Sequence, residues 1–245
     1  MKVLIAGGRG RVGSKVADLL ESNGVEVVSG GLDDGVDYLE GTGVPEALEG
    51  VHTIINVLNT RSFDKDAAVA FFEGTTRTLS AEGARAGVEH HILLSIVGVG
   101  QGDASDVGYY FGKVAQEKAV KEGPLPYTIV RSTQFHAYVP VLADQHAVDG
   151  EVRAPRELIQ PVALDELVSL LAEVALARAP LGELEVAGPE RYYMDDLLRG
   201  TLAASGDARE VVTVPSHGPV DVMVPRGEYR MGHELYPVRG IPLAD

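Results

Sequence analysis

A tyrosine, a lysine and an upstream serine are the side chains in this chain whose types and spacing best suit chemistry. Tyr109 and Lys113 lie four residues apart in the sequence YYFGK, so a helix would place them on one face. Ser95 precedes Tyr109 by fourteen residues, near the end of an apolar run. An ammonium beside a phenol favours the phenolate, so Lys113 is expected to lower the pKa of Tyr109. The three residues predict a site where Tyr109 exchanges a proton with a substrate oxygen that Ser95 also binds. The alternative is a helix with two exposed polar residues and a buried strand serine.

A glycine-rich turn near the start of the chain supplies a second candidate site. The apolar run 3–6 predicts a buried strand, and residues 14–22 have apolar positions at helical spacing. Gly7, Gly10 and Gly13 lie between them at intervals of three. A strand, a glycine turn and a helix in this order form the arrangement that holds a pyrophosphate at a helix N-terminus. The pattern therefore predicts a dinucleotide site, with a tight structural turn as the alternative.

The elements that would position these residues alternate between strand and helix through the first half of the chain. Strands are expected at 3–6, 25–28, 53–58, 91–97 and 127–130, with a very short one at 36–39. Helices are expected at 14–22, 64–86 and 106–122, with a single turn at 45–49. This alternation predicts an α/β fold with a doubly wound parallel sheet, whose ligands bind at the carboxyl ends of the strands.

The pattern is less regular after residue 135. Helices are expected at 139–145, 164–177 and 194–204, and strands at 183–187 and 211–214. The last thirty residues are rich in glycine and proline and are expected to wrap the surface. This half of the chain is therefore expected to form a cap on the first domain, not an independent unit.

Seven motifs in a fixed order resemble those of one family. They are GGRGRVG at 7–13, INVLN at 55–59, HHILLSIVGV at 90–99, YYFGK at 109–113, PYTIVRSTQF at 126–135, QPVALDEL at 160–167 and AGPE at 187–190. Together they resemble an atypical short-chain dehydrogenase/reductase of the NmrA-like group. The resemblance implies an NAD(P)-binding Rossmann domain over 1–135 and a small α/β substrate-binding cap over 136–245, packed on it.

The same resemblance assigns roles to individual residues. Ser95, Tyr109 and Lys113 match the catalytic positions, and Lys113 is also expected to bind the ribose beside the nicotinamide. Asn59, expected at the end of a strand, matches residues that line this ribose. Thr133, Gln134 and Phe135 match the floor around nicotinamide and substrate. His136 follows directly and is expected either to contact the substrate or to be an ordinary cap residue.

The choice between NADP and NAD depends on two residues near the glycine loop. The loop residues expected to bind the cofactor are Gly7, Arg9, Gly10, Arg11, Val12 and Gly13. Arg9 replaces a residue that is usually threonine in the family, and its guanidinium suits a 2′-phosphate. Asp33 stands twenty residues after Gly13, near the spacing of an acid that binds a ribose diol and selects NAD. We favour NADP, with NAD and a solvent-exposed Arg9 as the alternatives.

Composition excludes several classes of function. The net charge of −15 disfavours nucleic acid and anionic membranes as partners. The 245 residues include no cysteine, which excludes disulfides and thiolate chemistry. His90 and His91 are adjacent at a strand start and point to opposite faces, so no metal site is predicted. The N-terminal apolar run is too short for a signal peptide and no stretch approaches a membrane span, so the cytoplasm is the default location.

These observations predict an NAD(P)H-dependent oxidoreductase of the carbonyl reductase (ketoreductase) or alcohol dehydrogenase type. Its partner would be a small organic substrate. An aromatic substrate is one option, because the cap carries Phe135, Tyr138, Tyr192 and Tyr193. One alternative is a non-catalytic redox sensor that binds dinucleotide. Another is an epimerase, dehydratase or cyclase on the same fold. The sequence does not determine the oligomeric state.

Overall fold

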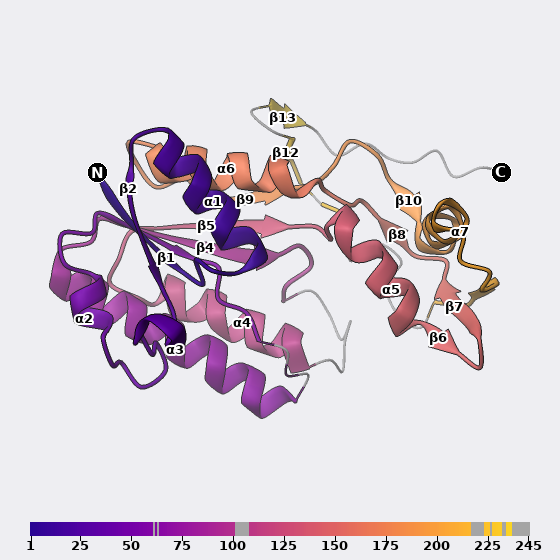
Figure 1. Ribbon diagram of the computed structural model, residues 1–245, viewed down its shortest axis with the longest axis horizontal. Helices are drawn as coiled ribbons and strands as arrows, with labels where there is room; N and C mark the ends of the chain where they lie inside the picture. Colours follow the sequence, from indigo (N-terminus) through magenta and orange to yellow (C-terminus); the bar gives the residue numbers. More distant parts are fainter. Residues whose placement is uncertain are drawn as a thin grey trace.

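The computed structural model describes residues 1–60, 62, 64–100, 108–216, 223–225, 227–231 and 234–236. Most of the chain forms one α/β layered structure, and a smaller part extends from one end of it (Figure 1). None of the helices in the described ranges is long and apolar enough to span a membrane.

An eight-stranded sheet runs through the centre of the larger part, in the order β13-β12-β9-β5-β4-β3-β1-β2. Seven of these strands run parallel, and β13 pairs antiparallel with β12 at one edge. The strands are β1 (Lys2–Ala6), β2 (Glu26–Gly30), β3 (Thr53–Asn56), β4 (His90–Ile96), β5 (Tyr127–Ser132), β9 (Gly182–Val186), β12 (Tyr229–Met231) and β13 (Glu234–Tyr236). The predicted doubly wound parallel sheet is confirmed.

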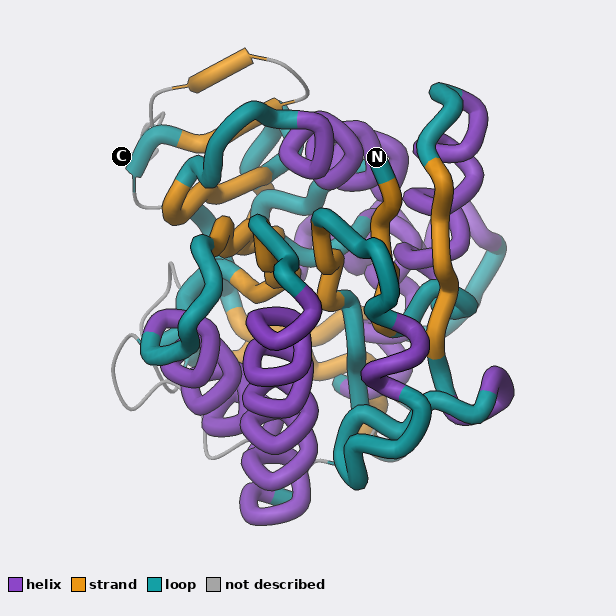
Figure 2. Tube along the Cα trace, turned by 90° about the vertical axis from the view of Figure 1, so that its left-hand side faces the viewer, coloured by secondary structure: helices purple, strands orange, loops and turns teal. Residues whose placement is uncertain are grey.

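Helices cover both faces of this sheet (Figures 1 and 2). One face packs against α1 (Arg11–Ser22) and α6 (Leu164–Leu176), and the other against α2 (Val44–Ala47), α3 (Lys65–Ala86) and α4 (Gly108–Lys121). Side chains of β1 alternate between the two layers: Val3 and Ile5 join the α1–α6 core, and Leu4 joins the core on the α2 side. This double burial explains why the strand is a continuous apolar run and not an alternating one.

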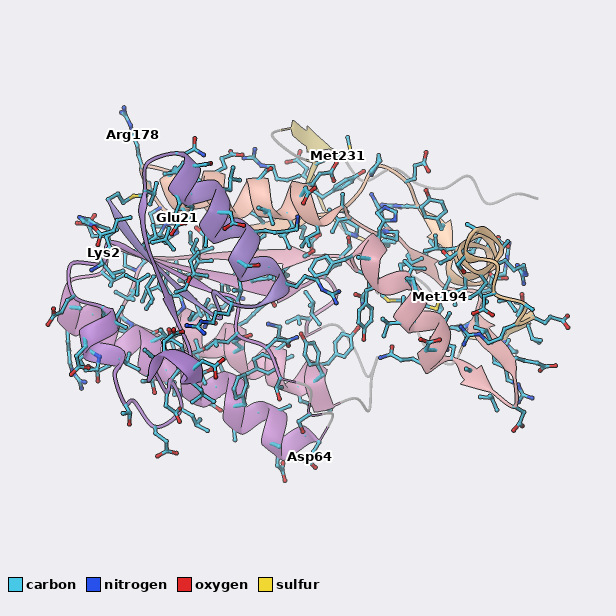
Figure 3. The ribbon with its side chains drawn as sticks, in the orientation of Figure 1. Lys2, Glu21, Asp64, Arg178, Met194 and Met231 are labelled. Atoms are coloured by element: carbon cyan, nitrogen blue, oxygen red, sulfur yellow. The ribbon has the colours of Figure 1, made fainter. Side chains whose placement is uncertain are left out.

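The smaller part, the cap, lies beyond the carboxyl ends of β4 and β5. In Figure 3, Lys2 marks the amino end of β1 and Met194 marks the cap at the opposite end of the molecule. The cap contains the 3₁₀ turn η2 (His136–Tyr138), α5 (Val139–Gln145), α7 (Met194–Ser205), a three-stranded sheet of β6 (Ala147–Val148), β7 (Glu151–Pro155) and β11 (Val211–Val214), and a two-stranded sheet of β8 (Leu158–Ile159) and β10 (Tyr192–Tyr193). It has its own buried cluster, which includes Met194 and Leu198.

Two features differ from the sequence expectation. Residues 36–39 form a turn and not a strand, because the Asp37 carboxylate accepts hydrogen bonds from the backbone N–H groups of Leu39 and Glu40. The stretch 136–245 contributes to both parts of the molecule, because α6, β9, β12 and β13 belong to the main layers. Part of the last thirty residues therefore extends the sheet. The start of the predicted helix 106–122 lies outside the described residues.

Candidate functional site

The glycine loop between β1 and α1 is packed too tightly for side chains at two positions. A Cβ atom on Gly13 would lie 2.3 Å from the Gly7 carbonyl oxygen and 2.8 Å from the Gly8 Cα. A Cβ on Gly8 would lie 2.5 Å from the Ser29 hydroxyl. Gly7 has a φ of +88°, a conformation that favours glycine. The sequence therefore needs its glycines here to bring the start of α1 close to the strand ends.

The first turn of α1 leaves hydrogen-bond donors free. Its first backbone bond runs from Ser14 N to Gly10 O, and the N–H groups of Arg11, Val12 and Gly13 have no protein acceptor among the described residues. Gly10 caps the helix without a side-chain hydrogen bond, and the first turn has no acidic residue. Free amides and an uncompensated helix dipole together form an anion site. This loop fits the pyrophosphate of a dinucleotide.

Arg9 and an acidic residue meet beside this loop. The Arg9 guanidinium forms an ion pair with Asp34, through Nη2 and Oδ1. Asp34 belongs to the 3₁₀ turn η1 (Leu32–Asp34), which follows β2 directly. Asp33 precedes it in the same turn and is exposed. Sequence reasoning weighed Arg9 against Asp33 as alternatives and missed Asp34, although its spacing from Gly13 is only one residue longer.

Tyr109 lies in the first turn of α4, at the end of the helix that adjoins the carboxyl edge of the sheet. Its ring packs edge-on against Phe72 of α3 and against Tyr110, at centroid distances of 5.5 and 6.4 Å. Burial, with a smaller effect of the nearby phenols of Tyr110 and of Tyr138 in the cap, raises the pKa of Tyr109 to about 12. Its hydroxyl has no hydrogen-bond partner among the described residues.

The close approach of α3 and α4 depends on the glycine within the YYFGK motif. A Cβ on Gly112 would lie 2.6 Å from the Phe72 ring and 2.9 Å from the Ala68 carbonyl oxygen. Gly112 therefore fixes the distance between the two helices and with it the position of Tyr109. Sequence reasoning took this residue only as part of a motif.

Lys113 is fully buried, and its ammonium points to neutral groups. Its Nζ donates to the Leu94 carbonyl oxygen at 2.9 Å and to Gln116 Oε1 at 2.7 Å, and it lies 4.6 Å from the Phe72 ring centroid. Burial lowers the pKa of Lys113 to about 7, an effect that the charge of Glu117 partly offsets. The expected lowering of the Tyr109 pKa by Lys113 is wrong for this structure, because burial and neighbouring phenols raise that pKa.

Ser95 is buried on the face of β4 that packs against α4. Its hydroxyl donates to Glu117 Oε1 at 2.7 Å, and Arg131 on β5 binds the same carboxylate through two hydrogen bonds. Glu117 follows Tyr109 by eight residues, which is about 12 Å along a helix. The structure therefore brings Ser95 to Glu117 and not to the Tyr109 hydroxyl. Glu117 was missed, although it continues the spacing of four that links Tyr109 and Lys113.

The remaining predicted residues follow β3 and β5. Asn59 is exposed, three residues beyond Asn56, where β3 ends; the strand was expected to reach it. Thr133 is buried, and its hydroxyl has no partner among the described residues. The segment Gln134–His136 crosses toward the cap, where the Gln134 carbonyl oxygen accepts from Val162 N at 2.8 Å and His136 N donates to Val162 O.

The side chains of this segment have different surroundings. Gln134 and Phe135 are half-buried, and Phe135 packs against the α1–α6 core. His136 is exposed at the start of η2. The Thr133 hydroxyl is thus a buried polar group at this edge that no described residue satisfies.

A comparison with family models identifies the chain. Residues 9–157, more than half of the sequence, match the model described as NAD(P)H-binding. The chain belongs to this NAD(P)H-binding family. This match covers residues 9–13 of the glycine loop, Tyr109 and Lys113, and it confirms the resemblance to atypical short-chain dehydrogenases/reductases. No curated protein matches the chain.

Solved structures share the fold across nearly the whole length of this NAD(P)H-binding protein. The dTDP-4-dehydrorhamnose reductase of Bacillus anthracis, solved with NADP, has a TM-score of 0.74 and 17% identity, and covers 90% of this chain and 88% of its own. The UDP-glucose 4-epimerase of Thermus thermophilus, solved with NAD, has a TM-score of 0.68 and 17% identity, with coverages of 95% and 96%. An NAD-dependent NDP-hexosamine 5,6-dehydratase from tunicamycin biosynthesis has a TM-score of 0.70 and 19% identity, with coverages of 92% and 89%. At these identities the likeness shows the fold alone.

Proposed function

We propose that this protein is an NADPH-dependent reductase of a carbonyl group on a small organic substrate, with Tyr109 as the proton donor. The observation that carries the proposal is the state of Tyr109. Its side chain is half-buried, its pKa is raised to about 12 so that the phenol is protonated at neutral pH, and its hydroxyl has no hydrogen-bond partner among the described residues. A protonated phenol suits reduction, because the alkoxide that forms from a carbonyl needs a proton.

The glycine loop supports the cofactor half of the proposal. The free N–H groups of Arg11, Val12 and Gly13 would bind the pyrophosphate, and Thr133 and Asn59 would lie nearer the nicotinamide. When bound, the reduced nicotinamide supplies the hydride. The protein's own contribution is to bind and orient both partners and to hold a proton at the Tyr109 oxygen until the substrate oxygen accepts it.

NADP is the proposed form because Arg9 retains donors for a phosphate. Asp34 engages Nη2 of the guanidinium, and among the described residues no acceptor binds Nε or Nη1, which would donate to a 2′-phosphate. Asp34 also opposes that choice, because its carboxylate would repel a phosphate held close by. The balance between these two side chains therefore determines the preference, and both can be varied separately.

The substrate is proposed to lie between the Tyr109 hydroxyl and the cap. The Tyr138 phenol is near enough to raise the pKa of Tyr109, and its oxygen accepts a hydrogen bond from Gln145 at 2.9 Å. Tyr192 and Tyr193 already have partners in the cap, since Tyr192 donates to Glu190 and the Arg156 guanidinium lies over the Tyr193 ring at 4.0 Å. Tyr138 is therefore the cap aromatic that best supports an aromatic substrate.

Replacing Tyr109 with phenylalanine tests the proposal, because it keeps the ring contacts and removes the proton. We expect Tyr109→Phe to lower turnover with NADPH across a panel of carbonyl and quinone substrates by about 10²-fold or more, with cofactor affinity nearly unchanged. Tyr110→Phe is the matched control and should retain turnover within a few-fold. Equal turnover in the Tyr109 variant and the wild type would exclude Tyr109 as the proton donor.

A second candidate function is a dinucleotide-binding sensor without catalysis. It is favoured by the engagement of two predicted catalytic groups elsewhere: the Ser95 hydroxyl donates to Glu117, and the Lys113 ammonium donates to Leu94 O and Gln116. Tight cofactor binding with no hydride consumption by the wild-type protein on the same substrate panel would support this candidate. Measurable turnover that depends on Tyr109 would reject it.

A further inference from the structure

Four charged side chains and one serine form a hydrogen-bonded cluster between α4 and the sheet. The Glu117 carboxylate, 4% exposed, accepts from Ser95 Oγ at 2.7 Å and from Arg131 Nε and Nη2 at 2.8 and 2.6 Å. Arg131 also pairs with Glu183 at 2.7 Å, and Lys121 pairs with Glu183 at 2.7 Å and with Glu117 at 3.6 Å. Glu117 is therefore the centre of a network in which two cationic side chains, Arg131 and Lys121, pair with its carboxylate.

Lys113 lies one helical turn before this carboxylate and is equally buried, at 3% exposure. Its hydrogen-bond partners, the Leu94 carbonyl oxygen and the Gln116 amide oxygen, are neutral, and no carboxylate among the described residues pairs with it directly. A buried ammonium without a nearby anion loses its proton readily. The negative charge of Glu117 is thus the main electrostatic interaction that stabilises the Lys113 ammonium.

We propose that Glu117 is a positioning residue whose negative charge favours the protonated form of Lys113, while Arg131 and Ser95 hold the carboxylate in place. The catalytic consequence rests on the proposed function, because a charged Lys113 matters there for ribose binding and for the charge near Tyr109. The electrostatic relation between Glu117 and Lys113 does not depend on it and can be measured in the protein without cofactor.

Every group that faces Lys113 is consistent with this assignment. From α4, Glu117 is charged and Tyr109 is a neutral phenol; from α3, the Phe72 ring is neutral; from β4, the contact is a carbonyl oxygen. The other charged groups of the cluster are Arg131 on β5, which pairs with Glu117 and Glu183, and Lys121, which pairs with the same two carboxylates. Burial lowers the pKa of Lys113 to about 7, and Glu117 is the neighbour whose charge opposes this shift.

The test is an NMR titration of Lys113 in the full-length protein without cofactor, using lysine labelled at Cε and Nζ. Lys113→Arg assigns the signal. In Glu117→Gln we expect the apparent pKa of Lys113 to fall by about one unit. A shift of this size corresponds to the Coulomb energy of two partly screened charges about one helical turn apart. Glu183→Gln is the matched control, because it removes one negative charge from the same cluster but leaves the Glu117 carboxylate next to Lys113. Its Lys113 titration should match the wild type.

The outcomes separate this inference from the proposed function. An equal shift in both variants, or none in Glu117→Gln, overturns the inference whatever the enzyme does. If Glu117→Gln does not fold, the double variant Glu117→Gln with Arg131→Gln is compared with Arg131→Gln alone, so that the two proteins differ only in the Glu117 charge, and the Lys113 pKa must be lower in the double variant. A shifted titration in a protein that shows no hydride transfer would retain the role of Glu117 and reject the proposed reductase.

Discussion

Replacing Gly13 with alanine tests whether the loop between β1 and α1 holds the cofactor. The added Cβ would lie 2.3 Å from the Gly7 carbonyl oxygen, whereas real Cβ contacts essentially never fall under 3.0 Å, so loop and helix must separate by at least 0.7 Å (3.0 minus 2.3). The contact atoms are backbone, so no side-chain rotation can relieve the clash. That carbonyl oxygen also accepts the Gly10 N–H bond at 2.9 Å, which the shift would disturb.

The expected cost follows from overpacking and from misaligned amides. Overpacking of this kind destabilises proteins by about 1–3 kcal/mol. If a similar energy is lost from the pyrophosphate contacts, the dissociation constant for NADPH rises about 10- to 100-fold. Isothermal titration calorimetry measures the affinity, and urea unfolding measures the stability.

Gly200→Ala is the matched control for this substitution. Gly200 lies in α7, and a Cβ there has no atom within 4 Å, so the variant should bind cofactor normally and gain up to about 1 kcal/mol of stability. If Gly13→Ala folds and binds NADPH with wild-type affinity, the loop does not hold the pyrophosphate, and the site derived from its free amides is wrong.

Two further predictions concern charge. Arg9→Ala should weaken NADP⁺ binding by about tenfold or more and leave NAD⁺ binding nearly unchanged, because only a 2′-phosphate needs the guanidinium. Asp34→Asn should shift the preference further toward NADP⁺, because it removes a negative charge beside Arg9. Calorimetry with both cofactors measures these affinities, and an equal loss of NADP⁺ and NAD⁺ binding in Arg9→Ala would refute the role of Arg9. His91, buried with Nδ1 3.1 Å from the Ser80 hydroxyl, has its pKa lowered from 6.5 to about 4 by burial and by His90, so the folded state resists protonation and stability is lost as pH falls below 6.5. Urea unfolding should show a loss of about 2 kcal/mol between pH 7.5 and pH 5 that His91→Gln largely abolishes, and an unchanged slope in that variant would place the effect elsewhere.

Local patterns were sufficient to predict most elements of both parts. The apolar run 53–58 predicts a strand that is covered on both faces. The structure agrees, since Ile54 and Ile55 are both buried, on opposite faces of β3. Helix 139–145 begins and ends where its apolar spacing predicts. The strand predicted at 36–39 was wrong. Four residues with Val36 and Tyr38 on one side fit a strand as well as a turn, and the hydrogen bonds that the Asp37 side chain accepts favour the turn.

The glycine loop, the helix that carries Tyr109 and Lys113, and the order of strands and helices around them could all be predicted from the sequence, because each depends on neighbours within a few residues. The contacts of those side chains could not, because they come from segments far away in the chain. The partner of Ser95 comes from α4, twenty-two residues later, and the partner of Arg9 from the turn after β2. Burial by segments that are distant in the sequence raises the pKa of Tyr109 and lowers the pKa of Lys113. This desolvation depends on tertiary packing, which no local sequence pattern predicts.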